Sequence, residues 1–132
     1  MNIEINIEAL RKNRFIFKLP EELGIYYWMV KSIKKSKHYL NMENERKLYV
    51  TISECCGFGD IDAIKYCEKF NALNLDEVTY CDLDSTGLEL TEEHYRNPRI
   101  LDISFSGSDY EDDSIKTFNI TIKYDSCYLK EK

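Results

Sequence analysis

Apolar and polar residues alternate with a period of two in several short segments, and this pattern limits the possible folds more than any other feature of the sequence. Neighbouring side chains of a strand point to opposite faces, so the pattern is typical of strands with one buried and one exposed face. The strands expected from alternation and β-propensity cover residues 2–8, 14–19, 48–53, 78–81, 101–106 and 117–124. The last two frame a polar loop and predict an antiparallel hairpin, in which Phe105 and Phe118 are expected to be buried.

Two further segments favour helices. Asp60 is expected to cap a helix over residues 60–72. The apolar face expected for this helix consists of Ile61, Ile64, Cys67 and Phe70. Residues 21–39 follow a proline and carry lysines toward their end, so a helix is the preferred interpretation there. The aromatic run within 25–33 leaves a strand open as the alternative.

These elements predict a single α+β domain over residues 1–132, with a mostly antiparallel sheet packed by one or two helices. The length fits one domain with one core. Residues 91–93 are expected to open a short helical turn. Residues 125–132 are polar and are expected to form a frayed tail.

The composition excludes several classes of protein. No apolar run approaches the ~18 residues that span a bilayer, and no signal peptide is expected because the sequence does not open on a basic segment followed by an apolar one. The five cysteines include no C-x-x-C spacing, so they are expected to be mostly buried, with no disulfide scaffold and no zinc site. His38 and His94 are expected to be exposed. We therefore expect a cytoplasmic protein that uses no cofactor.

Charge is distributed unevenly along the chain, whose formal net charge is −6. Residues 1–50 carry ten basic and six acidic residues, whereas residues 51–113 carry four basic and sixteen acidic residues. The densest acidic segment is the loop of the predicted hairpin, and a second acidic cluster precedes it. The loop residues are Asp109, Tyr110, Glu111, Asp112 and Asp113, and the second cluster consists of Asp82, Asp84, Glu92 and Glu93.

An acidic surface that also presents an aromatic side chain is typical of proteins that bind a basic partner. Both clusters are therefore predicted to bind a protein with a basic cleft. Because the sequence contains no recognisable catalytic motif, the preferred hypothesis is a non-enzymatic cytosolic inhibitor, namely an immunity protein that neutralises a nuclease toxin. The alternative of the same kind is a phage anti-defence protein, such as an anti-CRISPR inhibitor. Neither hypothesis involves direct contact with nucleic acid or with a membrane.

Two alternatives from other classes stay open. Residues 82–93 partly match a calcium-binding loop, whose ligands would be Asp82, Asp84, Thr86 and Glu93. Glu89 stands where such loops carry an apolar residue, so a turn between two strands is the simpler interpretation. An unrecognised enzyme would use a carboxylate pair or a cysteine nucleophile, for which Cys55 and Cys56 are the candidates.

Overall fold

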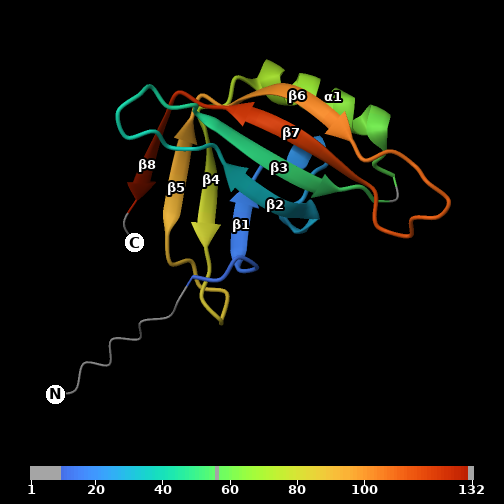
Figure 1. The fold of residues 1–132 in the computed structure, drawn as a ribbon, viewed down its shortest axis with the longest axis horizontal. Helices are drawn as coiled ribbons and strands as arrows, with labels where there is room; N and C mark the ends of the chain where they lie inside the picture. The colour runs from blue at the N-terminus through green and yellow to red at the C-terminus, as the bar shows by residue number, and fades with distance from the viewer. Residues whose placement is uncertain (1–9, 56, 131–132) are drawn as a thin grey trace.

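The structure is a computed structural model, and it describes residues 10–55 and 57–130 (Figure 1). In chain order, the elements are β1 (Phe15–Lys18), the 3-10 turns η1 (Glu21–Leu23) and η2 (Tyr27–Met29), β2 (Val30–Lys35), β3 (Lys47–Ser53), α1 (Asp60–Leu73), β4 (Glu77–Asp82), β5 (Glu92–Arg96), β6 (Arg99–Phe105), β7 (Thr117–Lys123) and β8 (Ser126–Lys130). The predicted α+β fold, mostly antiparallel and packed by a helix, is confirmed. The strand expected over residues 2–8 lies outside the described residues.

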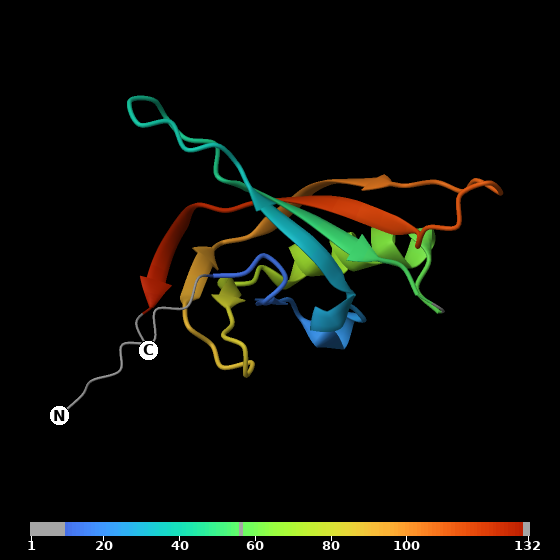
Figure 2. The same cartoon turned by 60° about the horizontal axis from the view of Figure 1, so that its bottom comes forward.

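The strands divide between two four-stranded sheets instead of forming one. The strand orders are β1-β4-β5-β8 and β2-β3-β7-β6, and all pairings within both sheets are antiparallel. The strands of the two sheets run in different directions, and α1 lies along β6 of the second sheet (Figures 1 and 2). Asn71 holds the helix there, since its side-chain amide exchanges hydrogen bonds of 2.9 and 2.8 Å with the backbone of Ile100.

The core lies beneath the second sheet and confirms the period-two pattern of β3 and β7. Their apolar residues pair across the two strands, and all are almost completely buried. The pairs are Leu48 with Ile122, Val50 with Ile120, and Ile52 with Phe118. Burying one such side chain stabilises the fold by roughly 1.5–3 kcal/mol. Phe105 differs from the expectation, because it lies on the edge strand β6 and stays 36% exposed.

The helix predicted over 60–72 is present as α1, but it presents a different face to the core. Its buried residues are Ala63, Tyr66, Cys67 and Phe70, whereas Ile61 and Ile64 are exposed. The cap also differs from the expectation. Gly59 is the N-cap residue, and its N–H donates to the Asp62 carboxylate at 3.0 Å. Residues at i, i+3, i+4 and i+7 share a helix face, so more than one such stripe fitted this sequence and packing selected the one that contains Tyr66.

Residues 21–39 do not form the expected helix. The segment forms two 3-10 turns and then the edge strand β2, so the strand alternative over 25–33 is right only from Val30 onward. Gly24 has a φ of +106°, a left-handed conformation that interrupts a helix. A Cβ at Gly24 would lie 3.3 Å from the Phe58 ring, so a larger residue would also crowd the core. The segment gains more from pairing with β3 than from local helix propensity.

Two strands replace elements that were expected to be a helical turn and a frayed tail. Residues 92–96 form β5, which pairs with β4 on one side and β8 on the other. Residues 126–130 form β8, an edge strand whose side chains are all exposed. A strand exposed in this way carries no alternating pattern, and its backbone pairing with β5 is what orders it.

Candidate functional site

The predicted acidic loop joins β6 to β7 and projects beyond the end of the second sheet (Figures 1 and 2). The side chains of residues 109–113 are exposed, and Tyr110 is fully so. Two carboxylates shape the loop by accepting backbone N–H groups: Asp109 from Glu111 at 3.0 Å and Asp112 from Ser114 at 2.9 Å. Hydrogen bonds from the hydroxyl and N–H of Ser114 lower the pKa of Asp112. The loop therefore presents negative charge and one aromatic ring outward, and its role in binding a partner stays a prediction.

The second acidic cluster lies on the first sheet, away from this loop (Figures 1 and 2). Asp82 accepts hydrogen bonds from Tyr80 and Thr91, at 2.8 and 2.9 Å. Asp84 accepts three from Thr86 and Leu88, which lower its pKa, the Thr86 hydroxyl most strongly. These carboxylates hold the turn between β4 and β5. The described residues contain no group of three or more His, Cys, Asp or Glu that could hold a metal ion.

His94 is buried in the first sheet, so the expectation that it is exposed is wrong. It is 6% exposed and lies between two carboxylates. Its Nδ1 lies 2.8 Å from Oε1 of Glu77, and its Nε2 lies 2.8 Å from Oε1 of Glu92. The Tyr128 hydroxyl donates to the other oxygen of Glu77 at 2.9 Å. The cluster connects β4, β5 and β8, and nothing in the local sequence around His94 marks it.

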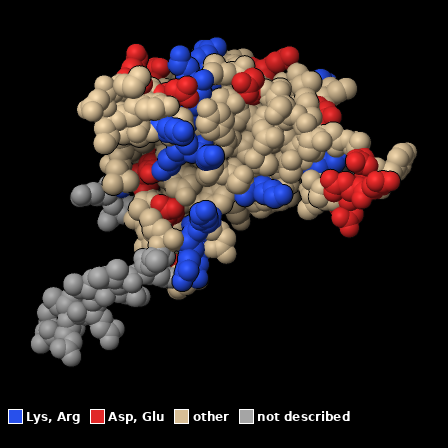
Figure 3. All heavy atoms as spheres, viewed as in Figure 1, with Lys and Arg blue, Asp and Glu red and all other residues tan. Residues whose placement is uncertain are grey.

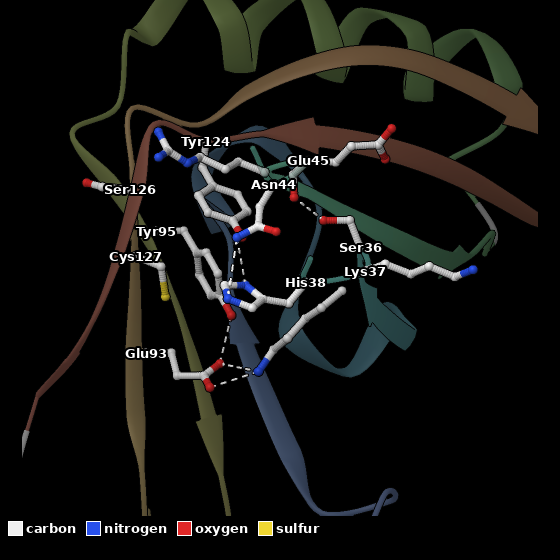
Figure 4. A pocket seen from close by; sticks show the side chains of 12 residues that line it. Ser36, Lys37, His38, Asn44, Glu45, Glu93, Tyr95, Tyr124, Ser126 and Cys127 are labelled. Atoms are coloured by element: carbon white, nitrogen blue, oxygen red, sulfur yellow. Dashed lines mark hydrogen bonds and ion pairs between the residues drawn. The ribbon is translucent and has the colours of Figure 1, made fainter. Parts of the chain in front are cut away.

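We call residues 36–46, which connect β2 to β3, the arm. A hollow of about 460 Å³ lies between the root of the arm and the first sheet (Figure 4). Glu93 is one of the lining residues, and its carboxylate binds Lys35 at 2.8 Å and accepts a hydrogen bond from the Tyr95 hydroxyl at 2.7 Å. On the arm, the Asn44 amide lies 3.0 Å from Nδ1 of His38. Much of the polar lining of the hollow is thus engaged within the chain.

The arm extends away from the sheets (Figure 2), and several of its apolar side chains are exposed. Leu40 is 89% exposed, and Tyr39 and Met42 are exposed as well. Apolar side chains presented together on a projecting segment are typical of contact surfaces between proteins. The arm is therefore a candidate element of an interface.

A second candidate surface is the lysine–aromatic groove, which we define by Lys12, Phe15, Tyr27, Trp28, Lys31, Lys34 and Tyr80. It consists of two adjoining hollows of about 590 and 500 Å³ that share Lys12, Phe15 and Lys31. The hollows lie where edge strand β1 of the first sheet meets edge strand β2 of the second. Figure 3 shows basic side chains across this region of the face and acidic side chains gathered on the projecting loop.

Exposed aromatic rings border the groove. Trp28 is 61% exposed, and its ring stacks on that of Tyr26 with centroids 6.0 Å apart. Deeper in the groove, Phe15 stacks on Tyr80 at 5.9 Å. The run of aromatic residues at 26–28 and the positive charge of residues 1–50 are visible in the sequence. That lysines of this segment lie next to Tyr80 of β4 is a consequence of the fold and is not visible in the sequence.

The fold resembles those of several solved structures along the whole chain. A protein of an extracellular contractile injection system, from the PVC sheath/tube terminator in the extended state, is 12% identical, with a TM-score of 0.68 over 95% of this chain and 99% of that one. The tube-terminating cap of the anti-feeding prophage is 16% identical, with a TM-score of 0.64 over 100% and 97%. A chain of the anti-feeding prophage baseplate is 11% identical, with a TM-score of 0.61 over 96% and 98%.

No family model matches the sequence, and the search of curated proteins gives no match. Within the described residues, no helix has the length and apolar character needed to cross a membrane. The names of the similar structures describe parts of injection systems and no enzymatic activity.

These similarities overturn the predicted function. The fold is similar to that of chains in solved terminator, cap and baseplate structures, and the interpretation as an immunity protein or an anti-CRISPR inhibitor is wrong. The predicted partner, a nuclease with a basic cleft, is wrong on the same ground. Both predictions, of the function and of the partner, rest on the distribution of charge. A charged surface determines the charge of the partners it attracts, but it does not identify the class of protein that carries it.

Proposed function

We propose that the chain is a structural subunit of a contractile injection system and packs into a ring or cap of its tube. The observation that carries this proposal is the extent of the similarity. Each of the matched terminator, cap and baseplate chains corresponds to this chain almost from end to end. The similarity therefore runs along the aligned chains and is not confined to a fragment of them.

The surface of the chain supports an assembled state. Each sheet has two edge strands, and the edge strand β8 presents exposed side chains along its length. Unpaired edges bind other chains readily unless they are covered. The arm with its exposed apolar side chains and the projecting acidic loop add two further protrusions. This role uses contact surfaces and needs no catalytic residue, and we propose that the subunit folds and assembles in the cytoplasm.

The proposal is tested by producing the chain together with the tube and sheath proteins of a contractile injection system and examining purified particles by electron microscopy. We expect the chain to copurify with the particles and to appear as ordered density at one end of the tube. A Phe118→Ala variant, which loses the centre of the core, serves as the control that should be absent from the particles. Particles that form normally and never contain the wild-type chain would contradict the proposed function.

A further inference from the structure

The chain carries two surfaces of opposite charge at different places in the fold. One is the lysine–aromatic groove between β1 and β2, and the other is the acidic loop at the end of the β6–β7 hairpin. Figure 3 shows the acidic side chains of the loop standing clear of the basic region of the face. Within the described residues, the two surfaces therefore do not pair with each other.

Three lysines of the groove have no ion-pair partner among the described residues. Within residues 10–55 and 57–130, no acidic side chain forms an ion pair with Lys12, Lys31 or Lys34. The neighbouring Lys35 is different, since it binds Glu93 at 2.8 Å and lies over the Tyr80 ring at 5.3 Å. Of the four lysines that line the two hollows, only Lys35 therefore forms an ion pair within the described part of the chain.

The aromatic rings beside these lysines are also exposed. Tyr27 and Trp28 are 55% and 61% exposed and line the same hollow as Lys12 and Lys31. Exposed tryptophan and tyrosine are enriched at the centres of protein interfaces, because they bury a large area at low entropic cost. A segment that combines carboxylates with one aromatic ring would fit such a groove.

The acidic loop has that composition. It places four carboxylates around Tyr110, which is fully exposed. Asp109 and Asp112 stabilise turns within the loop, so the loop loses little conformational entropy on binding. Within the described part of the chain, the ion pairs include none that joins a loop carboxylate to a lysine.

We propose that the lysine–aromatic groove of one copy of the chain binds the acidic loop of a second copy. This inference rests on the proposed function, because a ring or cap is built from repeated contacts between copies. Two different surfaces that bind each other form a heterologous, head-to-tail contact, and such contacts generate closed rings or filaments. A second copy is favoured over other acidic partners because the complementary loop, with its own aromatic residue, is present on the same chain.

The test is a charge-reversal experiment on the purified chain. The groove variant carries Lys31→Glu and Lys34→Glu, and the loop variant carries Asp109→Lys and Asp112→Lys. Sedimentation velocity and negative-stain microscopy measure self-association at low and at high salt. We expect self-association of the wild type to weaken with salt, and each variant alone to associate about tenfold more weakly or worse.

Restored pairing then distinguishes a direct contact from a general effect of charge. An equimolar mixture of the two variants should associate, because each reversed surface then meets a complementary one, and a chain carrying all four substitutions should associate with itself. The matched control carries Lys65→Glu and Lys69→Glu, the same charge change on the exposed face of α1, and should behave like the wild type. Unchanged melting temperatures establish that the variants are folded.

Two outcomes overturn the inference, and both can be told apart from failure of the proposed function. If the wild type associates and the groove and loop variants associate equally well, the copies meet through other surfaces and the proposed function is unaffected. If the wild type remains monomeric at high concentration and low salt, the groove does not bind a second copy. Incorporation of the chain into injection-system particles is then still measured separately by electron microscopy.

Discussion

The ring of Tyr128 on β8 stacks on the imidazole of His94 on β5, with centroids 4.8 Å apart and planes 9° apart. The same tyrosine donates its hydroxyl hydrogen to Glu77 on β4 at 2.9 Å. One side chain of the edge strand therefore covers the buried histidine and binds the carboxylate beside it. This contact ties β8 to the interior of the first sheet.

Replacing Tyr128 with phenylalanine should make the protein more sensitive to acid. The pKa of Glu77 lies below its ordinary value of 4.5, mainly because the Tyr128 hydroxyl donates a hydrogen bond to the carboxylate. His94 lowers this pKa further. A lowered pKa contributes stability above pH ~4.5 that is lost as the pH falls through the folded-state value. In Tyr128→Phe this contribution shrinks, so unfolding by acid, followed by circular dichroism, should occur at a higher pH. Tyr49→Phe, an exposed tyrosine on β3, is the control and should unfold as the wild type does.

Glu54 should show the opposite dependence on pH. Burial raises the pKa of its carboxyl, and the nearby Asp60 raises it further, while Lys116 at 3.6 Å partly offsets both. The favourable protonated form is present below the ordinary pKa of 4.5, and its contribution is lost as the pH rises through the raised value. Glu54→Gln should therefore raise the melting temperature near neutral pH and have little effect in acid. An equal gain at every pH, or a gain matched by Glu68→Gln on the exposed face of α1, would exclude this explanation.

Tyr66 and Tyr95 are both buried but differ in the hydrogen bonding of their hydroxyl groups. The Tyr66 hydroxyl is buried without a hydrogen-bond partner among the described residues, whereas the Tyr95 hydroxyl donates to Glu93 at 2.7 Å. An unpaired buried polar group costs about 1–3 kcal/mol, so Tyr66→Phe should be neutral or stabilising. Tyr95→Phe should destabilise the fold by about 1 kcal/mol or more, because it leaves Glu93 one donor short. Urea unfolding measures both, and a destabilised Tyr66→Phe would point to a partner for its hydroxyl.

Substitutions in the core should destabilise the fold far more than substitutions in the acidic loop. Phe118 is fully buried and stacks on Phe58 with centroids 6.0 Å apart, so Phe118→Ala should cost about 3–5 kcal/mol. Asp109→Lys with Asp112→Lys lies on exposed positions and should change stability by about 0.5 kcal/mol or less. Phe105→Ala, at a partly exposed edge position, should fall between them. Thermal melts test this order, and a loop variant that melts as early as Phe118→Ala would give the loop a structural role.

The period-two pattern of residues 48–53 and 117–124 was sufficient to predict β3 and β7, because each of these strands buries one face and exposes the other. The spacing within 60–72 predicted α1 for the same reason, although it did not fix which side faces the core. The acidic loop was also predictable, since it interrupts two alternating segments. Local periodicity determines an element when one of its faces is buried.

Tertiary structure alone decided the remaining features. The strand β5 exists because it pairs with β4 and β8, and β8 exists because it pairs with β5; neither carries an alternating pattern of its own. His94 is buried because Tyr128, distant in sequence, covers it, and the groove exists because β1 and β2 end up as neighbouring edges of two sheets. The sequence by itself determined which segments could become strands or a helix, and it supplied the charges. Which strands paired, and which charges became neighbours, depended on long-range backbone hydrogen bonds and shared burial, which no local window of sequence contains.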